Sequence, residues 1–262
     1  MSLLTVSAVT KQFGPHIGVS SVSFELDAGE SAVIVGANGA GKTTLIRMLA
    51  SLSRPTEGEI LLDGEPVIGN ANARSRIGVV GHDTMLYDEL TARENLKLHA
   101  RLHGVPESRS EQLLETVGLA TRGSDRVDGF SHGMQKRVSL ARALLHDPDL
   151  LLFDEPYSGL DQASLQRITE VLSALEDKTV IATTHDLERG YHLADSVLFF
   201  YRGQLVEQAP TTEFDDVTDL IERYDENCRL GDGQTTPGVS PTGTTPTTVT
   251  TDGNRPIDGG EN

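Results

Sequence analysis

A glycine-rich stretch of eight residues is the first part of this sequence whose residue types could do chemistry. It reads GANGAGKT from Gly36 to Thr43 and fits the phosphate-binding pattern G-x-x-x-x-G-K-[ST]. Its glycines allow backbone N–H groups to surround phosphate oxygens. Lys42 is expected to reach the β- and γ-phosphates, and Thr43 to offer its hydroxyl to Mg²⁺. The pattern predicts a nucleoside triphosphate site formed by Gly36, Ala37, Asn38, Gly39, Ala40, Gly41, Lys42, Thr43 and Thr44.

Two carboxylates at the end of an apolar run form a second candidate group. Asp154 and Glu155 follow the run LLLF, which predicts a buried strand over residues 150–153. At a strand end, Asp154 can hold Mg²⁺, often through water, and Glu155 can orient or deprotonate an attacking water. A strand that ends in Asp-Glu is by itself more often a solvated edge. The phosphate-binding stretch upstream favours the catalytic interpretation.

A third candidate group lies at the start of a predicted helix. Ser131 and Gly133 precede apolar residues at helical spacing, namely Met134, Val138, Ala141 and Leu145. A serine at this position is first of all an N-cap. The same helix end is also a second anion site, because free backbone N–H groups and the helix dipole attract phosphate.

The surrounding sequence predicts the elements that must position these residues. A strand over 31–35 runs into the glycine-rich stretch and a helix over 42–52 follows it, which disfavours a chance match. Strands separated by helices predict an α/β fold with a mostly parallel sheet. Between the two halves of this core, about 88–146, a helical insert begins at a capping box of Thr91 and Glu94. The other predicted elements are strands 3–9, 20–27, 59–62, 77–80, 179–183 and 196–201 and a helix over 162–175.

Composition limits the class of protein. No run approaches the roughly 18 apolar residues of a membrane span, and the N-terminus lacks the pattern of a signal peptide. The single cysteine, Cys228, excludes an internal disulfide framework. These features predict a soluble cytoplasmic protein. His99 and His103 have metal-ligand spacing on a helix, but without a third ligand nearby a solvated face is the simpler interpretation.

The charge is strongly acidic. The formal net charge is −17, and five lysines stand against seventeen arginines. This balance argues against general nucleic-acid binding, which needs a basic surface. An acidic, lysine-poor chain is similar to proteins of salt-loving organisms, in which salt screens self-repulsion; an ordinary acidic protein is the alternative. Residues 230–262 are rich in Thr, Gly and Pro, and predict a disordered, inert tail.

Together these motifs resemble the ATP-binding subunit of ABC transporters, from residue 3 to about 215. FSHGM at 130–134 resembles the signature motif Leu-Ser-Gly-Gly-Gln, and LLLFDEP at 150–156 resembles the Walker B strand. The stretch 158–161, SGLD, looks like the D-loop. His185 looks like the switch histidine that contacts the γ-phosphate, and Phe13 stands where the family stacks an aromatic ring on adenine.

The resemblance implies a P-loop NTPase core, an N-terminal antiparallel β subdomain and a helical insert at about 86–146, all within one ATP-binding domain over 1–229. It implies ATP hydrolysis with Mg²⁺ in a head-to-tail homodimer. Separate integral membrane permease subunits would bind at the cytoplasmic face of the membrane, with no nucleic acid as partner. The implied catalytic residues are Glu155 and His185, the metal ligands Thr43, Asp154 and His82, and the further nucleotide contacts Phe13, Ser131, Gly133 and Asp161.

Three departures from the family pattern matter. His132 and Met134 replace a glycine and the glutamine of the signature, and Gly81-His82 replaces the usual Pro-Gln. Gly81-His82 and the segment 87–96 look like the haem-exporter ATP-binding subunit of cytochrome c maturation. The alternatives are the ATPase of a general drug, lipid or polysaccharide exporter, a soluble ABC-type ATPase, and a regulatory module that holds ATP without hydrolysing it.

Overall fold

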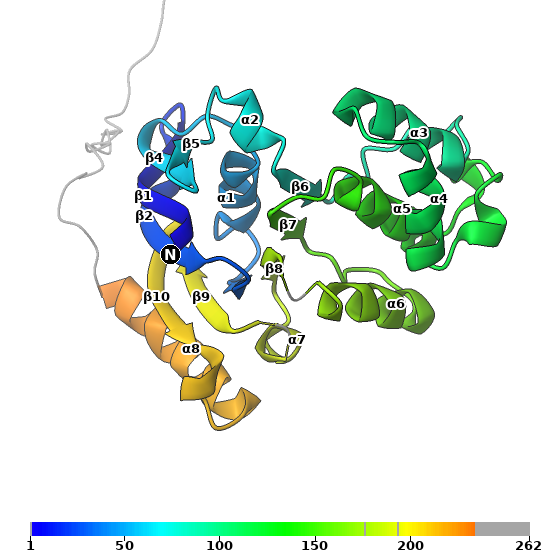
Figure 1. Ribbon diagram of the computed structural model, residues 1–262. Coiled ribbons are helices and arrows are strands. Elements are labelled where there is room, and N and C mark those ends of the chain that lie inside the picture. Colours follow the sequence, from blue (N-terminus) through cyan, green and yellow to red (C-terminus); the bar gives the residue numbers. More distant parts are fainter. Residues whose placement is uncertain (1, 176, 193, 234–262) are drawn as a thin grey trace, which may run out of the picture.

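The computed structural model describes residues 2–175, 177–192 and 194–233, which form two sheets with helices between and around them (Figure 1). The strands are β1 (Ser2–Phe13), β2 (His16–Asp27), β3 (Ser31–Val35), β4 (Glu57–Leu62), β5 (Glu65–Pro66), β6 (Ile77–Val80), β7 (Leu150–Asp154), β8 (Thr179–Thr184), β9 (Ser196–Tyr201) and β10 (Gln204–Pro210). The helices are α1 (Lys42–Leu49), α2 (Ala71–Arg74), α3 (Ala92–His103), α4 (Ser108–Thr116), α5 (His132–Leu144), α6 (Gln162–Ser173), α7 (Leu187–Tyr191) and α8 (Val217–Gly233). Short 3₁₀ turns lie at Ala120–Arg122, Val127–Gly129 and Thr211–Glu213.

The N-terminal sheet is antiparallel, with strand order β2-β1-β4-β5. The predicted strands 3–9 and 20–27 are confirmed, but the hairpin extends to Phe13 and His16, which pair across the turn at Gly14-Pro15. The side chains near the tip of the hairpin are exposed, so the alternation of apolar residues stops before the tip. Only backbone pairing shows that the two strands continue to it.

The second sheet carries the candidate site. Its order is β10-β9-β3-β8-β7-β6, and every pair is parallel except β10 with β9, which confirms the mostly parallel core. Parallel strands end at one edge of a sheet, where α/β proteins bind their ligands. The topology therefore brings together the segments that follow β3, β6, β7 and β8. The first and last of these strand ends, at residues 35 and 184, are far apart along the chain.

Helix α1 packs between the two sheets, as Figure 1 shows. Leu45, Ile46, Met48 and Leu49 are buried there. The predicted helix over 42–52 is three residues too long, because Ser51 turns into the left-handed region at φ +57°. The N–H groups of Leu52 and Ser53 both donate to the carbonyl of Arg47, which ends the helix and leaves Leu52 60% exposed.

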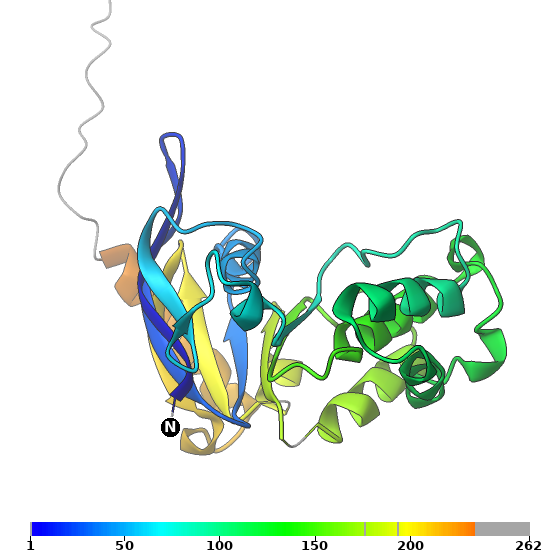
Figure 2. The ribbon, with the colours of Figure 1, turned by 45° about the horizontal axis from the view of Figure 1, so that its top comes forward.

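The helical insert comprises α3, α4 and α5 and lies at the opposite end of the molecule from the N-terminal strands (Figure 2). The predicted capping box is confirmed: the N–H of Glu94 donates to Thr91 Oγ1 at 3.1 Å, and the N–H of Thr91 donates to Glu94 Oε2 at 2.9 Å. The insert thus begins where the sequence predicted. The limits of the predicted domain, 1–229, and of the subdomain at about 86–146 remain predictions.

Four polar side chains of α5 and its C-terminal end cover the outer edge of the core sheet. Strand β6 stands at that edge, and its alternate carbonyls point away from β7. Hydrogen bonds from Arg142 and His146 satisfy carbonyls of β6 that would otherwise be left without a partner strand. Those from Lys136 and Ser139 reach carbonyls of the loop after β6. The donors and acceptors are Lys136 Nζ to Gly81 at 2.8 Å, Ser139 Oγ to Thr84 at 3.0 Å, Arg142 Nη2 to Val79 at 2.7 Å and His146 Nε2 to Ile77 at 3.2 Å.

The predicted solvated face of His99 and His103 is wrong for His99, because α3 packs against α5 there. His99 is half-buried, and burial is the main cause that lowers its pKa to about 4, with Arg142 adding to it. The ring of His103 stacks on His146 at 4.2 Å between centroids. Within the described part of the chain, no group of three His, Cys, Asp or Glu side chains is arranged to hold a metal.

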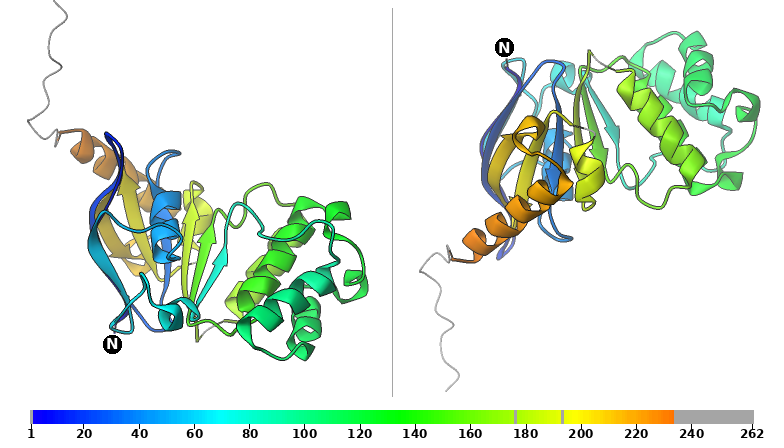
Figure 3. Two further views of the ribbon diagram at one scale, coloured as in Figure 1. Left: turned by 90° about the horizontal axis from the view of Figure 1, so that it is seen from above. Right: turned by 90° about the horizontal axis from the view of Figure 1, so that it is seen from below.

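Helix α8 crosses β9 and β10 on the face of the core sheet opposite α1 (Figure 3). It includes Cys228 and ends at Gly233, whereas the sequence placed the start of the tail at residue 230. The remainder of the predicted tail, 234–262, lies outside the described residues. Among the helices that are described, none has the length and apolarity to cross a membrane.

Candidate phosphate-binding and catalytic site

The glycine-rich stretch leaves the core at the end of β3 and enters α1 at Lys42. Two of its glycines are sterically required. A Cβ at Gly36 would lie 2.4 Å from the carbonyl oxygen of Phe200, and a Cβ at Gly41, where φ is +106°, would lie 2.4 Å from that of Gly18. The loop therefore fits closely against β9 and β2, and its remaining residues form the open end of the turn.

Lys42 lies inside the turn of this loop. Its ammonium donates to the carbonyls of Gly36 at 2.6 Å and Ala37 at 3.2 Å, and lies 3.9 Å from Glu155 Oε1. Burial lowers the pKa of Lys42, while the neighbouring charges of Glu155 and Asp154 oppose that shift. The loop thus holds a buried cation at the start of a helix, which is a favourable place for a phosphate group.

A cavity of about 380 Å³ opens over the loop. It brings most of the predicted loop residues together with Phe13, whose ring is 53% exposed, and Glu155. Gly36 and Ala37 do not line this cavity, and the N–H of Ala37 donates instead to the hydroxyl of Tyr224 at 3.0 Å. The lining residues are Phe13, Gly18, Asn38, Gly39, Ala40, Gly41, Lys42, Thr43, Thr44 and Glu155.

Asp154 ends the fully buried strand β7 and faces the loop. Its Oδ1 accepts hydrogen bonds from Thr43 Oγ1 at 3.0 Å and from Thr183 Oγ1 at 2.9 Å. Thr183 was not among the predicted site residues, although it stands directly beside Asp154 in the parallel register of β7 and β8. The Thr43 hydroxyl and the Asp154 carboxylate are hard oxygen ligands, so this pair fits Mg²⁺.

Glu155 occupies a strained backbone position. Its φ is +52°, in the left-handed region, which costs a non-glycine residue about 1–3 kcal/mol. Its N–H donates to Thr183 Oγ1 at 3.0 Å, and its Oε2 accepts from His185 Nδ1 at 3.0 Å. Such strain persists where the surroundings fix the conformation, and here it directs a carboxylate between Lys42 and His185.

His82 fits a metal site less well than Thr43 and Asp154 do. Its exposed ring lies on the loop after β6, the strand paired with β7, so it belongs to the same sheet edge as Asp154. Imidazole nitrogen suits zinc, copper or iron better than Mg²⁺, which prefers oxygen. The chemistry of the donors therefore favours Thr43 and Asp154 as direct ligands, without His82.

Ser131, Gly133 and Asp161 do not line the cavity of their own chain. Ser131 caps α5 by accepting from the N–H of Met134 at 3.3 Å, and Asp161 caps α6 by accepting from the N–H of Ser164 at 2.8 Å. Gly133 packs against the start of α6, where an added Cβ would lie 2.2 Å from Ser164 Oγ and 2.6 Å from Ser164 Cβ. In one chain, these residues have structural roles at two helix starts.

Replacing Gly133 by alanine is expected to lower the free energy of unfolding by about 2 kcal/mol, because the methyl group overpacks the contact between α5 and α6. Denaturant unfolding measures the effect. The double variant Gly133→Ala, Ser164→Gly should lose less than the sum of its two single variants, since the clashing side chain is gone. Additive losses would show that the contact with Ser164 is not the cause.

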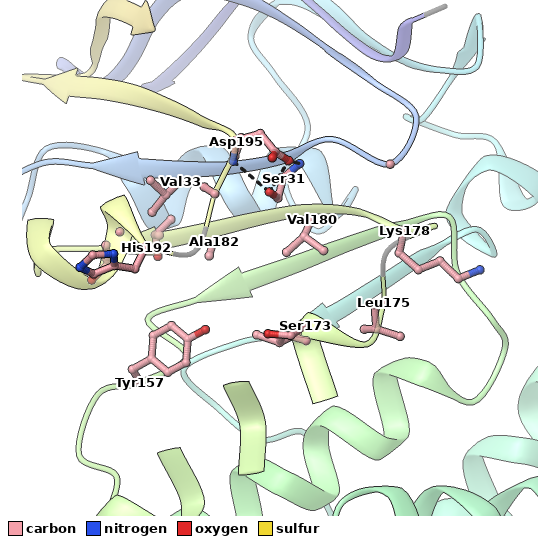
Figure 4. Close-up of a pocket in the computed structure, with 17 residues that line it drawn as sticks. Ser31, Val33, Tyr157, Ser173, Leu175, Lys178, Val180, Ala182, His192 and Asp195 are labelled. Atoms are coloured by element: carbon pink, nitrogen blue, oxygen red, sulfur yellow. Dashed lines mark hydrogen bonds between the residues drawn. The ribbon is translucent and has the colours of Figure 1, made fainter. Parts of the chain in front are cut away.

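A second cavity, of about 340 Å³, lies on the face of the core sheet opposite α1 (Figure 4). Figure 4 shows Val33, Val180 and Ala182 on its sheet side, with Tyr157 and Leu175 facing them from across the hollow. It is a gap between the sheet and helices α6 and α7. It contains none of the predicted site residues, so the first cavity remains the candidate site.

Residues 19–158 match the protein family described as ABC transporter. The chain is 43% identical over 196 residues to the ABC transporter ATP-binding protein NatA of Bacillus subtilis, with 72% of this chain and 80% of that protein covered. It is 39% identical over 226 residues to the Nod factor export ATP-binding protein I of Burkholderia lata, with 82% and 74% covered. A solved dimer of an ATP-binding cassette in a post-hydrolysis state with ADP and Pi is 26% identical and matches with a TM-score of 0.73, over 79% of this chain and 98% of that one.

Proposed function

This chain belongs to the ABC transporter family of ATP-binding proteins, and from that premise we propose that it hydrolyses ATP to power export through separate membrane subunits. The observation that carries the proposal is the position of the Glu155 carboxylate. It lies beside the buried Lys42 ammonium and accepts a hydrogen bond from His185, at the mouth of the phosphate-binding loop. A base and a cation are thus adjacent where a terminal phosphate would lie.

The chemistry follows from these contacts. On ATP binding, Lys42 would exchange its loop carbonyls for the β- and γ-phosphates, while backbone N–H groups at the start of α1 hold the remaining charge. Thr43 and Asp154 would hold Mg²⁺, which neutralises charge that develops on the phosphate oxygens. Glu155 would orient a water and take its proton as that water attacks the γ-phosphate. His185 would hold Glu155 in place and contact the γ-phosphate.

A second copy of the chain would complete the site. Ser131, Gly133 and Asp161 lie outside the cavity of their own chain, at helix starts that attract anions. The dimeric state of the related ATP-binding cassette supports a dimer, and the family resemblance implies its head-to-tail arrangement. Since ATP offers a γ-phosphate to both copies and ADP does not, hydrolysis would weaken the dimer.

The cargo is best proposed at a general level. The relatives named above are an ABC transporter ATP-binding protein and a Nod factor export protein, so they favour a general exporter and give no support to haem export or cytochrome c biogenesis. The contact of Glu155 with His185 disfavours a module that holds ATP without hydrolysing it. We place the protein at the cytoplasmic face of the membrane with its permease subunits. The proposal that the protein works in a salt-rich cytoplasm rests only on its acidic, lysine-poor composition.

Nucleotide-dependent dimerisation tests this proposal. With Mg²⁺ and ATP, the variant Glu155→Gln is expected to double its mass from the 28.2 kDa of one chain, because ATP is bound but not cleaved. Light scattering coupled to size exclusion measures the mass. Runs at low salt and in molar KCl cover both ionic strengths that the composition suggests, and ADP is the control that should leave monomers. A variant that stays monomeric with ATP under both conditions contradicts the proposed dimer.

A further inference from the structure

Helix α8 lies far from the phosphate loop in sequence but is fastened to the same part of the sheet (Figures 1 and 3). Its buried Leu220 packs in a cluster with Val33 and Val35 of β3. On its polar side, Arg223 Nε donates to both carboxylate oxygens of Glu207 on β10, each at 3.0 Å. The helix is therefore held by apolar packing on one side and by an ion pair on the other.

Tyr224 connects helix α8 to the phosphate loop. Its ring stacks on Phe199 at 6.2 Å between centroids, with 26° between the ring planes. Phe199 stands beside Val35, the last residue of β3, in the register of the sheet. The hydroxyl of Tyr224 consequently reaches beyond the strand end, where it accepts a hydrogen bond of 3.0 Å from the N–H of Ala37.

Ala37 is the point at which the loop leaves the core. Its carbonyl accepts from the N–H of Ala40 at 3.1 Å and from Lys42 Nζ at 3.2 Å, so it closes the turn that encloses the lysine. The preceding residue, Gly36, is fixed by close approach to Phe200. The N–H of Ala37 shares its peptide unit with the carbonyl of Gly36, which accepts from Lys42 Nζ at 2.6 Å. The hydrogen bond to Tyr224 thus holds one side of a peptide unit whose other side shapes the cation site.

We propose that Tyr224 is a positioning residue that fixes the phosphate loop in its nucleotide-binding conformation before the nucleotide arrives. The inference rests on the proposed nucleotide binding at this loop. A loop that is already ordered spares the nucleotide the entropy cost of ordering it, so the anchor raises affinity without touching the ligand. Burial, together with the Cys228 thiol, raises the pKa of Tyr224 to about 12, so the hydroxyl stays neutral at physiological pH.

The variant Tyr224→Phe tests the inference, because it removes the hydroxyl and keeps the stacked ring. We expect the dissociation constants of ATP and ADP to rise about three- to tenfold, which is the range for one lost hydrogen bond. Turnover at saturating ATP should stay within about twofold, since no group at the reacting phosphate has changed. Calorimetric titration gives the constants, and steady-state kinetics separate KM from kcat.

Tyr191→Phe is the matched control. The Tyr191 hydroxyl donates to the carbonyl of Phe214 at 3.1 Å, so this variant also removes one tyrosine hydrogen bond near α8 but leaves the loop untouched. Both variants should lower the melting temperature, and only Tyr224→Phe should weaken nucleotide binding. Unchanged affinity in Tyr224→Phe, or equal weakening in both variants, overturns the inference. Failure of the unmodified protein to bind nucleotide would instead remove the proposed function on which it rests.

Discussion

Replacing Glu155 by glutamine is expected to slow ATP hydrolysis by about two to three orders of magnitude while nucleotide affinity changes less than about threefold. Glutamine has nearly the same shape and can keep a hydrogen bond to His185, but it cannot accept the proton of an attacking water. The left-handed backbone at this position strains both residues equally, so folding should be unaffected. Phosphate release under saturating ATP measures the rate.

Glu188→Gln is the matched control for this prediction. Glu188 is exposed in the first turn of α7, three residues after His185, and does not line the candidate cavity. The control removes the same charge near the site and should hydrolyse ATP at the native rate. If Glu155→Gln also turned over at the native rate, the base would have to be sought elsewhere and the proposed role of Glu155 would be wrong.

Replacing Lys42 by alanine is expected to weaken ATP binding about a hundredfold. The ammonium is buried inside the loop with two carbonyl partners, so it is already in place for a phosphate group. Hydrogen bonds that involve charged groups contribute about 1.5–3 kcal/mol, and a hundredfold change lies at the upper end of that range. The loss should be larger for ATP than for ADP, because Lys42 would contact the γ-phosphate as well. Titration with both nucleotides measures it.

Lys178→Ala provides the comparison for Lys42. Lys178 is also a largely buried lysine, and its ammonium lies 3.2 Å from Asp147, remote from the phosphate loop. Its loss should lower stability and leave affinity for ATP unchanged. Equal affinity of Lys42→Ala and the native protein would exclude the loop as the phosphate site.

Most of the fold and the outline of the site could be predicted from local sequence patterns. The capping box at Thr91 and the strand before Asp154 each depend on a few neighbouring residues, so both appear in the sequence. The contact between Glu155 and His185 joins residues from the ends of two strands, β7 and β8. A family resemblance can suggest that such residues act together, but only the register of the strands gives their distance.

The residues that the sequence analysis missed act through contacts between distant elements. Thr183 matters because β8 lies beside β7, and Tyr224 because α8 crosses β9. The half-buried state of His99 similarly depends on how α3 packs against α5. No spacing along the chain encodes these neighbours. Composition likewise left the cargo undetermined, because a subunit that supplies energy need not contact what is moved.

Two polar side chains directed at β6, Arg142 of α5 and His146 two residues after its end, also affect how the molecule behaves in a crowded solution. A bare outermost strand offers its backbone as a template on which an unrelated strand can pair, and this is a common route to aggregation. Here Arg142 and His146 already occupy the acceptors of Val79 and Ile77 that such a strand would need. The outward carbonyls of Ile77 and Val79 are therefore not free along this margin, and an intruding chain would first have to displace a half-buried guanidinium.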